Sequence, residues 1–209
     1  MYRFFFFFFL ISPFLYGSEV DRSISSYEKR EKRKIDHFDF SGDWLNIKNI
    51  DIDAKRKKCV ELDLTGNYPL LQEINFQGGF GLLKGQITGQ FPKLSIINIL
   101  CGSSSMTLDF TSQWTRSCNI NIRGQNEDVV LYIPHNIGIS INTKVGALGK
   151  VYVDGLKKKG FGLLNKRYEN ALLEESPIVL HFNIETNEGN IVVNVCESSD
   201  QESSVQKEI

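Results

Sequence analysis

Short bursts of alternating apolar and polar residues return along this chain at nearly constant spacing, and they constrain the fold more than any other feature. Alternation over four to seven residues, bounded by Gly, Asn, Asp, Ser or Pro, is typical of β-strands with one buried face. The bursts centre near residues 62, 74, 87, 97, 108, 120, 131, 141 and 151, with further strands around 180 and 193. No convincing helical stretch separates them, so the sequence predicts an all-β fold.

The regularity of the spacing, ten to thirteen residues between centres, favours a solenoid. Evenly spaced short strands also suit a sandwich or a barrel. However, glycine or a tight polar turn occupies nearly every gap, and obvious Asn-Gly hairpin turns are missing. Two strands per coil give a coil of about 22 residues, whose inward side chains stack on those of the next coil. We therefore predict a two-sheet β-solenoid (a single-stranded β-helix) with flanking disordered tails.

The N-terminal segment holds an apolar block, Phe4 to Tyr16, behind a single Arg. As a helix this block spans only ~20 Å, short of the ~30 Å hydrocarbon core of a bilayer. A short apolar block behind a basic start predicts a secretory signal peptide over residues 1–17. The expected localisation is export to the periplasm or cell surface. The alternative is a membrane-anchored protein, because the positive charges that follow the block disfavour export.

Composition divides the rest of the chain. Residues 18–37 are polar and charged and predict a linker, 38–196 carry the solenoid pattern, and 197–209 predict a disordered tail. Within the solenoid, residues 154–176 lack alternation and predict an inserted loop, or a departure of the chain on one face. Their second half is compatible with a short helix, and the insertion suits either a functional role or a cap over an exposed edge.

The four cysteines, Cys59, Cys101, Cys118 and Cys196, match no zinc-binding spacing. An oxidising compartment permits disulfides between them. Cys101 and Cys118 also alternate in phase with apolar neighbours, so burial as small hydrophobic residues is at least as good an interpretation.

The chemistry-bearing residues form no catalytic set. His37, His135 and His181 each stand alone, and His181 is expected to face solvent from a strand. The chain contains neither a phosphate-binding loop nor a serine-hydrolase elbow. We therefore predict no catalytic residues, no cofactor and no metal site, and a protein that is not an enzyme.

Charge is balanced overall, with 25 acidic and 24 basic side chains and a net charge of -1, so a strong global field for nucleic acid or membrane is excluded. Local basic clusters remain. They form a candidate surface for an anionic partner such as a glycan, a wall polymer or lipid head groups. Nucleic acid is not expected, because no aromatic residues are interleaved with the charges. The alternatives are ordinary solvated turns, or charge that blocks end-to-end strand pairing. The residues are Lys55, Arg56, Lys57 and Lys58, and Lys157, Lys158 and Lys159.

Several short segments resemble one bacterial family. They are "LDF" at 108–110, "VLYIP" at 130–134, "VGALGKV" at 145–151 and "IETNEGNIVVNV" at 184–195. Together they resemble the toast-rack family, which includes LiaF-like cell-wall-antibiotic response proteins and related adhesin domains. The resemblance covers roughly residues 58–196. It implies a right-handed solenoid of the bacterial envelope that acts in stress sensing, surface interaction or adhesion, without catalytic residues.

Three functional hypotheses follow. The first is a non-enzymatic, exported solenoid that contacts an envelope partner or glycan through its surface. The second is an assembly module whose coil ends stack into homo-oligomers. The third is a carbohydrate-active β-helix enzyme, which requires carboxylates of neighbouring coils to converge in a groove. The carboxylates available for that role are Asp51, Asp53, Glu61 and Asp63.

Overall fold

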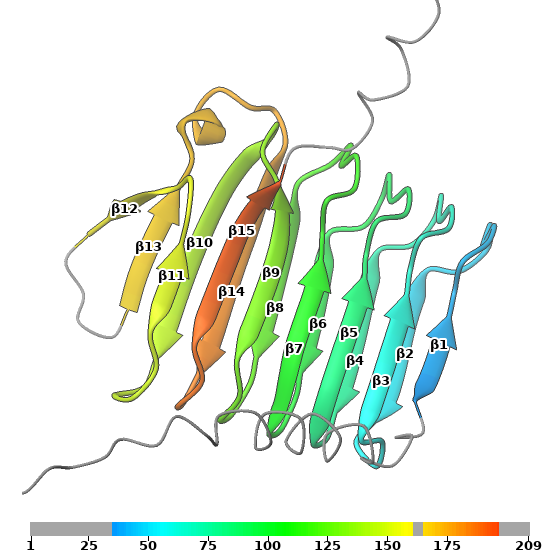
Figure 1. Ribbon diagram of the computed structural model, residues 1–209. Coiled ribbons are helices and arrows are strands. Elements are labelled where there is room, and N and C mark those ends of the chain that lie inside the picture. The colour runs from blue at the N-terminus through cyan, green and yellow to red at the C-terminus, as the bar shows by residue number, and fades with distance from the viewer. Residues whose placement is uncertain (1–34, 161–164, 197–209) are drawn as a thin grey trace, which may run out of the picture. The chain divides into compact units, whose positions relative to one another are not determined.

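The computed structural model describes residues 35–160 and 165–196, which form two largely parallel sheets facing each other (Figure 1). The first sheet contains, in spatial order, β1 (Asp36–Asp39), β3 (Cys59–Asp63), β5 (Gly81–Gln86), β7 (Ser104–Asp109), β9 (Val129–Pro134), β15 (Ile191–Cys196) and β11 (Val151–Val153). The second contains β12 (Lys157–Lys159), β13 (Asn165–Glu169), β10 (Gly138–Val145), β14 (Val179–Thr186), β8 (Cys118–Arg123), β6 (Ile96–Leu100), β4 (Glu73–Gly78) and β2 (Asn49–Ala54).

The chain alternates between the sheets with each strand from β1 to β11, which confirms the predicted two-strand coil. Asn75, Asn98 and Asn121 lie on successive strands of the second sheet, 23 residues apart in each step, close to the expected coil length. In Figure 1 the strands of the first sheet, which is nearer the viewer, run up, and β2, β4, β6, β8 and β10 behind them run down as the coil advances from β1, so the winding is right-handed. Parallel crossovers favour that sense.

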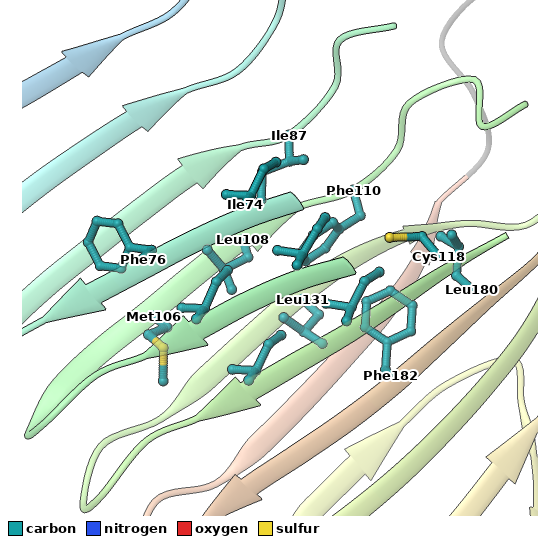
Figure 2. Close-up of a cluster of buried hydrophobic side chains, with 14 of the residues drawn as sticks. Ile74, Phe76, Ile87, Met106, Leu108, Phe110, Cys118, Leu131, Leu180 and Phe182 are labelled. Carbon is teal, nitrogen blue, oxygen red and sulfur yellow. The ribbon is translucent and has the colours of Figure 1, made fainter. Parts of the chain in front are cut away.

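The core lies between the sheets and is built by the inward side chains of every coil. Alternating strand residues point to opposite faces, so the branched and aromatic residues of each strand enter the same interior. Ile74, Ile97 and Ile120 are fully buried in consecutive coils. Figure 2 shows Phe182 meeting Phe110 across the sheets, with ring centroids 5.4 Å apart and nearly perpendicular planes. The resulting core is continuous along the stack.

One corner of the coil repeats with little change in sequence. The segments are "DFSGDW" (39–44), "DLTGNY" (63–68), "QITGQF" (86–91) and "DFTSQW" (109–114). Each aspartate that opens a segment accepts the N–H two residues on, at 2.8–3.0 Å. The aromatic residues that close three of these segments form a row, in which the Phe91 ring centroid lies 5.2 Å from that of Tyr68 and 5.8 Å from that of Trp114. Ile87, expected at the centre of a strand, therefore belongs to this corner, one residue beyond β5.

The last coil does not extend the stack but inserts into it. β14 lies between β8 and β10, and β15 lies between β9 and β11, all with parallel pairing. Phe182 of β14 thus pairs with Ile120 on one side and with Ile141 on the other. The expectation that consecutive coils stack in sequence order is wrong here, because the chain leaves one coil's width open after β9 and later returns to fill it.

The segment that lacks alternation makes this return possible. β12 and β13 pair with each other and then with β10 in antiparallel fashion, as a departure at one edge of the second sheet. The expected short helix is limited to the 3-10 turn η1 (Ala171–Leu173), while Asn165 to Glu169 form a strand. β1 begins at Asp36, two residues before the predicted boundary. The predicted signal peptide, most of the linker and the tail lie outside the described residues.

Candidate functional site

The two basic clusters lie at opposite ends of the second sheet. Residues 55–58 form the turn after β2, whereas residues 157–159 are the strand β12, and β2 and β12 are the two edge strands of that sheet. Lys57 is already engaged, since its Nζ lies 3.0 Å from Asp36. The structure therefore does not bring Lys55, Arg56, Lys57 and Lys58 together with Lys157, Lys158 and Lys159 into one surface.

A ladder of asparagine side chains runs along the outer face of the second sheet from Asp51 on β2 to Asn142 on β10. Each asparagine donates its Nδ2–H to the Oδ1 of the residue on the next strand toward β2. The distances are 2.8 Å from Asn75 to Asp51, 2.8 Å from Asn98 to Asn75 and 2.9 Å from Asn121 to Asn98. The ladder continues through the inserted coil, from Asn183 to Asn121 at 3.0 Å and from Asn142 to Asn183 at 3.1 Å.

The amide ladder has a direction and charged ends. All five amides point their N–H groups toward β2, where the carboxylate of Asp51 accepts the first bond. Their carbonyl ends point the other way, toward β13, where Arg167 pairs in register with Asn142 and Lys159 pairs with Arg167. Because residues paired in register share a face of the sheet, one row runs from an anion through five amides to two cations.

A groove of about 840 Å³ lies over the cationic half of this row. Its floor is the outer face of β6, β8, β14 and β10, and β13 with the end of β12 forms one flank. Leu100, 46% exposed, supplies an apolar spot in it. The polar lining consists of the ladder amides Asn98, Asn121, Asn183 and Asn142 with Arg123, Lys144, Lys159, Asn165, Lys166, Arg167 and Glu185.

Five basic residues and one carboxylate line the groove, and four of the five, Arg123, Lys144, Lys159 and Arg167, share the face of the amide ladder. Glu185 accepts from Lys144 at 2.5 Å and from Arg123 at 3.2 Å, and these contacts, the Lys144 hydrogen bond foremost, lower the pKa of its carboxyl. Outside the groove lining, Glu169 lies 2.6 Å from the Nε of Arg167. The Arg123 and Lys144 side chains remain 69% and 62% exposed, so they keep donors free for an anion while Glu185 fixes their position.

The carboxylates required by the enzyme hypothesis do not converge. Asp51 and Asp53 lie on the outer face of the second sheet, whereas Glu61 and Asp63 lie on β3 of the first sheet. The core separates the two pairs. Convergence of these four residues in one groove is therefore contradicted.

The histidines and cysteines add no reactive cluster. His181 is exposed on β14 as expected, His37 lies 3.0 Å from Glu61, and His135 contacts the Cys196 carbonyl oxygen at 3.1 Å. The four thiols are free. Burial raises the pKa of Cys101 to about 11 and that of Cys118 to about 12, so both act as core hydrophobic residues.

Within residues 35–160 and 165–196, no group of three or more His, Cys, Asp or Glu side chains is arranged to hold a metal ion. The same part of the chain has no helix with the length and apolar character needed to cross a bilayer.

Comparison with known proteins relates this chain to others through its fold. No family model matches it, and no curated protein matches it. Among solved structures it resembles the crystal structure, at 1.95 Å, of a "putative cell adhesion protein" from Clostridium sporogenes ATCC 15579, with a TM-score of 0.50 and 20% sequence identity. The match covers 67% of this chain and 58% of that one. At this identity the likeness establishes the shared fold.

Neither the amide ladder nor the groove was predicted from the sequence. A repeat in the sequence indicates part of the ladder, because Asn75, Asn98 and Asn121 recur at the coil period inside "INF" and "INI" segments. Asn183 and Asn142 had no such signal, since their places in the row depend on the insertion of β14. The groove likewise depends on the return of β13 beside β10.

Proposed function

We propose that this protein is a non-enzymatic adhesion module that binds a linear anionic polymer, such as an acidic envelope glycan, along the outer face of its second sheet. One observation carries the proposal: an unbroken row of amides runs into a groove with five cations and one carboxylate. Asn75, Asn121 and Asn183 each use one N–H and one lone pair in the ladder and keep a second of each for a ligand. Asn98 also donates to Oε1 of Glu73 at 3.4 Å, and Asn142, at the end of the ladder, only donates within it.

The geometry favours an extended ligand over a small one. Adjacent strands lie ≈ 4.8 Å apart, so the ladder offers the same polar group at every step over a length of several strands. The cations gather at one end of the row, which supports recognition of carboxylate, sulfate or phosphate groups there. Nucleic acid is a poorer fit, because the described residues that line the groove include no aromatic side chain on which bases could stack.

The proposal extends to family and location. Two facing parallel sheets of right-handed coils support membership of the toast-rack family, including its LiaF-like and adhesin branches. Export to the periplasm or cell surface is supported by the apolar block before residue 17, with anchoring by that block as the alternative. Intact-mass measurement on cell fractions tests this part: a soluble species that starts near Ser18 supports export, and a full-length membrane-held species supports the anchor.

The binding proposal is tested by fluorescence anisotropy with labelled polygalacturonate, a linear carboxylated polymer, and labelled dextran, its neutral counterpart. We expect polygalacturonate alone to bind, with an affinity that falls as salt rises. The double variant R123Q/R167Q removes two groove cations and is expected to bind about tenfold more weakly, which corresponds to ~1.4 kcal/mol.

The matched control is K55Q/R56Q, which removes the same charge at the other end of the sheet and should bind like the unmodified protein. Equal weakening by both double variants indicates a general charge effect and contradicts the proposed site. Equal binding of dextran and polygalacturonate contradicts the proposed ligand class.

A further inference from the structure

The outer faces of the two edge strands of the second sheet carry opposite charges, although the turn after β2 also carries Lys55, Arg56, Lys57 and Lys58. At one end the edge strand β2 presents Asp51 and Asp53 on its outer face. At the other end the edge strand β12 is Lys157, Lys158 and Lys159, all exposed. In the described part of the chain, each of these strands has a neighbour on one side only. Each edge therefore presents main-chain groups available for pairing.

Strand direction permits the two edges to join. β12 is antiparallel to β13, and β13 is antiparallel to β10, so β12 runs in the same direction as β10. β10, β14, β8, β6, β4 and β2 are all parallel. β12 of one copy and β2 of another would thus meet as parallel strands, which is the pairing used through the rest of the sheet.

The side-chain rows also match. The row that contains the amide ladder begins with Asp51 and ends with Lys159. If a second copy adds its β2 beside β12 in the same register, Lys159 faces Asp51 of that copy, with Asp53 on the diagonal. Lys157, two residues before Lys159, is also a diagonal neighbour of that Asp51. Opposite charges at facing positions stabilise strand pairs, and like charges there destabilise them.

We propose that this chain associates head to tail with copies of itself, through β12 of one copy and β2 of the next. The contact continues the second sheet and joins the amide ladders of the two copies through an Asp–Lys pair. The contact is formed by edge strands of the second sheet, and β12 contributes three residues to it. A contact of that size, held by exposed charges, is expected to be weak and sensitive to salt. Because it repeats head to tail, it gives open chains rather than closed dimers.

The competing explanation assigns the lysines the opposite role. A very short edge strand of lysines can prevent a sheet from pairing with the edge of another molecule. The two explanations predict opposite effects of removing the charge, which makes them separable in one experiment.

The experiment is sedimentation velocity of the purified full chain over a range of concentrations, at low and at high salt. We expect the mean sedimentation coefficient to rise with concentration at low salt and to fall back at high salt. K157Q/K159Q should weaken association roughly tenfold. Stronger association of this variant, or a monomer at every concentration of the unmodified chain, overturns the proposal.

Two charge-reversal variants provide the specific control. D51K/D53K alone and K157E/K159E alone should each remain monomeric, because like charges then face each other. Mixed in equal amounts they should associate again, since each supplies the edge that the other needs. All variants share the same first 34 residues, so that segment cannot account for differences among them. Failure of the mixture to associate while the unmodified chain does so shows that the contact lies elsewhere.

Discussion

The effect of Phe182→Ala on the free energy of unfolding tests whether β14 is inserted between β8 and β10. Phe182 is fully buried, pairs in register with Ile120 and Ile141, and meets the ring of Phe110 at 5.4 Å. A Phe-to-Ala change in a packed core costs about 3–5 kcal/mol. The edge-to-face contact of the two rings places the expected cost in the upper part of that range.

The assay is urea unfolding followed by tryptophan fluorescence. With a urea dependence of ~2 kcal/mol per molar, a loss of 4 kcal/mol lowers the midpoint by about 2 M. Phe80→Ala is the matched control, because Phe80 is 68% exposed and its loss should change stability by no more than about 0.5 kcal/mol. If F182A costs less than about 1 kcal/mol, β14 does not fill the space between β8 and β10.

Three further predictions follow from strand order, backbone packing and burial. N121C/N183C should form a disulfide on mild oxidation and N121C/N142C should not, because neighbouring strands lie ≈ 4.8 Å apart, which suits a disulfide, whereas twice that distance does not. Peptide mapping identifies the bridge. A disulfide in N121C/N142C alone would show that the coils stack in sequence order. Gly79→Ala should destabilise the protein by at least ~2 kcal/mol in the urea assay, because its Cβ would lie 2.0 Å from a carbonyl oxygen of the preceding coil; a neutral effect would refute this stacking of turns. The Cys118 thiol, whose pKa burial raises to about 12, should react with iodoacetamide only in denaturant, and labelling in native buffer followed by mass spectrometry would expose an error in its placement.

The solenoid could be predicted because each coil repeats the same physical pattern. Ile97 and Ile99 in one coil and Ile120 and Ile122 in the next show alternation that only a half-buried strand explains. Two such strands in each 23-residue period fix the two-sheet coil. The free, buried state of Cys118 was also among the predicted alternatives, since it alternates in phase with these isoleucines.

The order of the strands could not be predicted. A buried parallel strand with the pattern of β14 suits any neighbouring coil, because Ile120, Ile141 and Phe182 present the same kind of apolar surface. Local sequence therefore specifies that β14 is a strand, but not that it enters between β8 and β10. That choice depends on the space left after β9 and on the path of β13 along the edge, both of which are long-range features.

The candidate site could be predicted from the sequence only in part, for the same reason. The basic residues were found as sequence clusters, but the clusters did not show that Lys159 and Arg167 extend a row of asparagines. Pairing of β12 and β13 beside β10 brings Lys159 and Arg167 to the end of the amide ladder. The binding surface thus combines segments whose relation only the fold reveals.

The central claim is that a linear anionic polymer binds along the amide ladder. The most direct measurement follows the side-chain NH₂ signals of asparagines by NMR during titration with polygalacturonate. We expect the signals of Asn98, Asn121 and Asn183 to shift with increasing polymer, whereas that of Asn194, on the first sheet, should stay in place. Shifts confined to Asn194 and its surroundings, or no shifts at polymer concentrations that saturate the anisotropy signal, would contradict it.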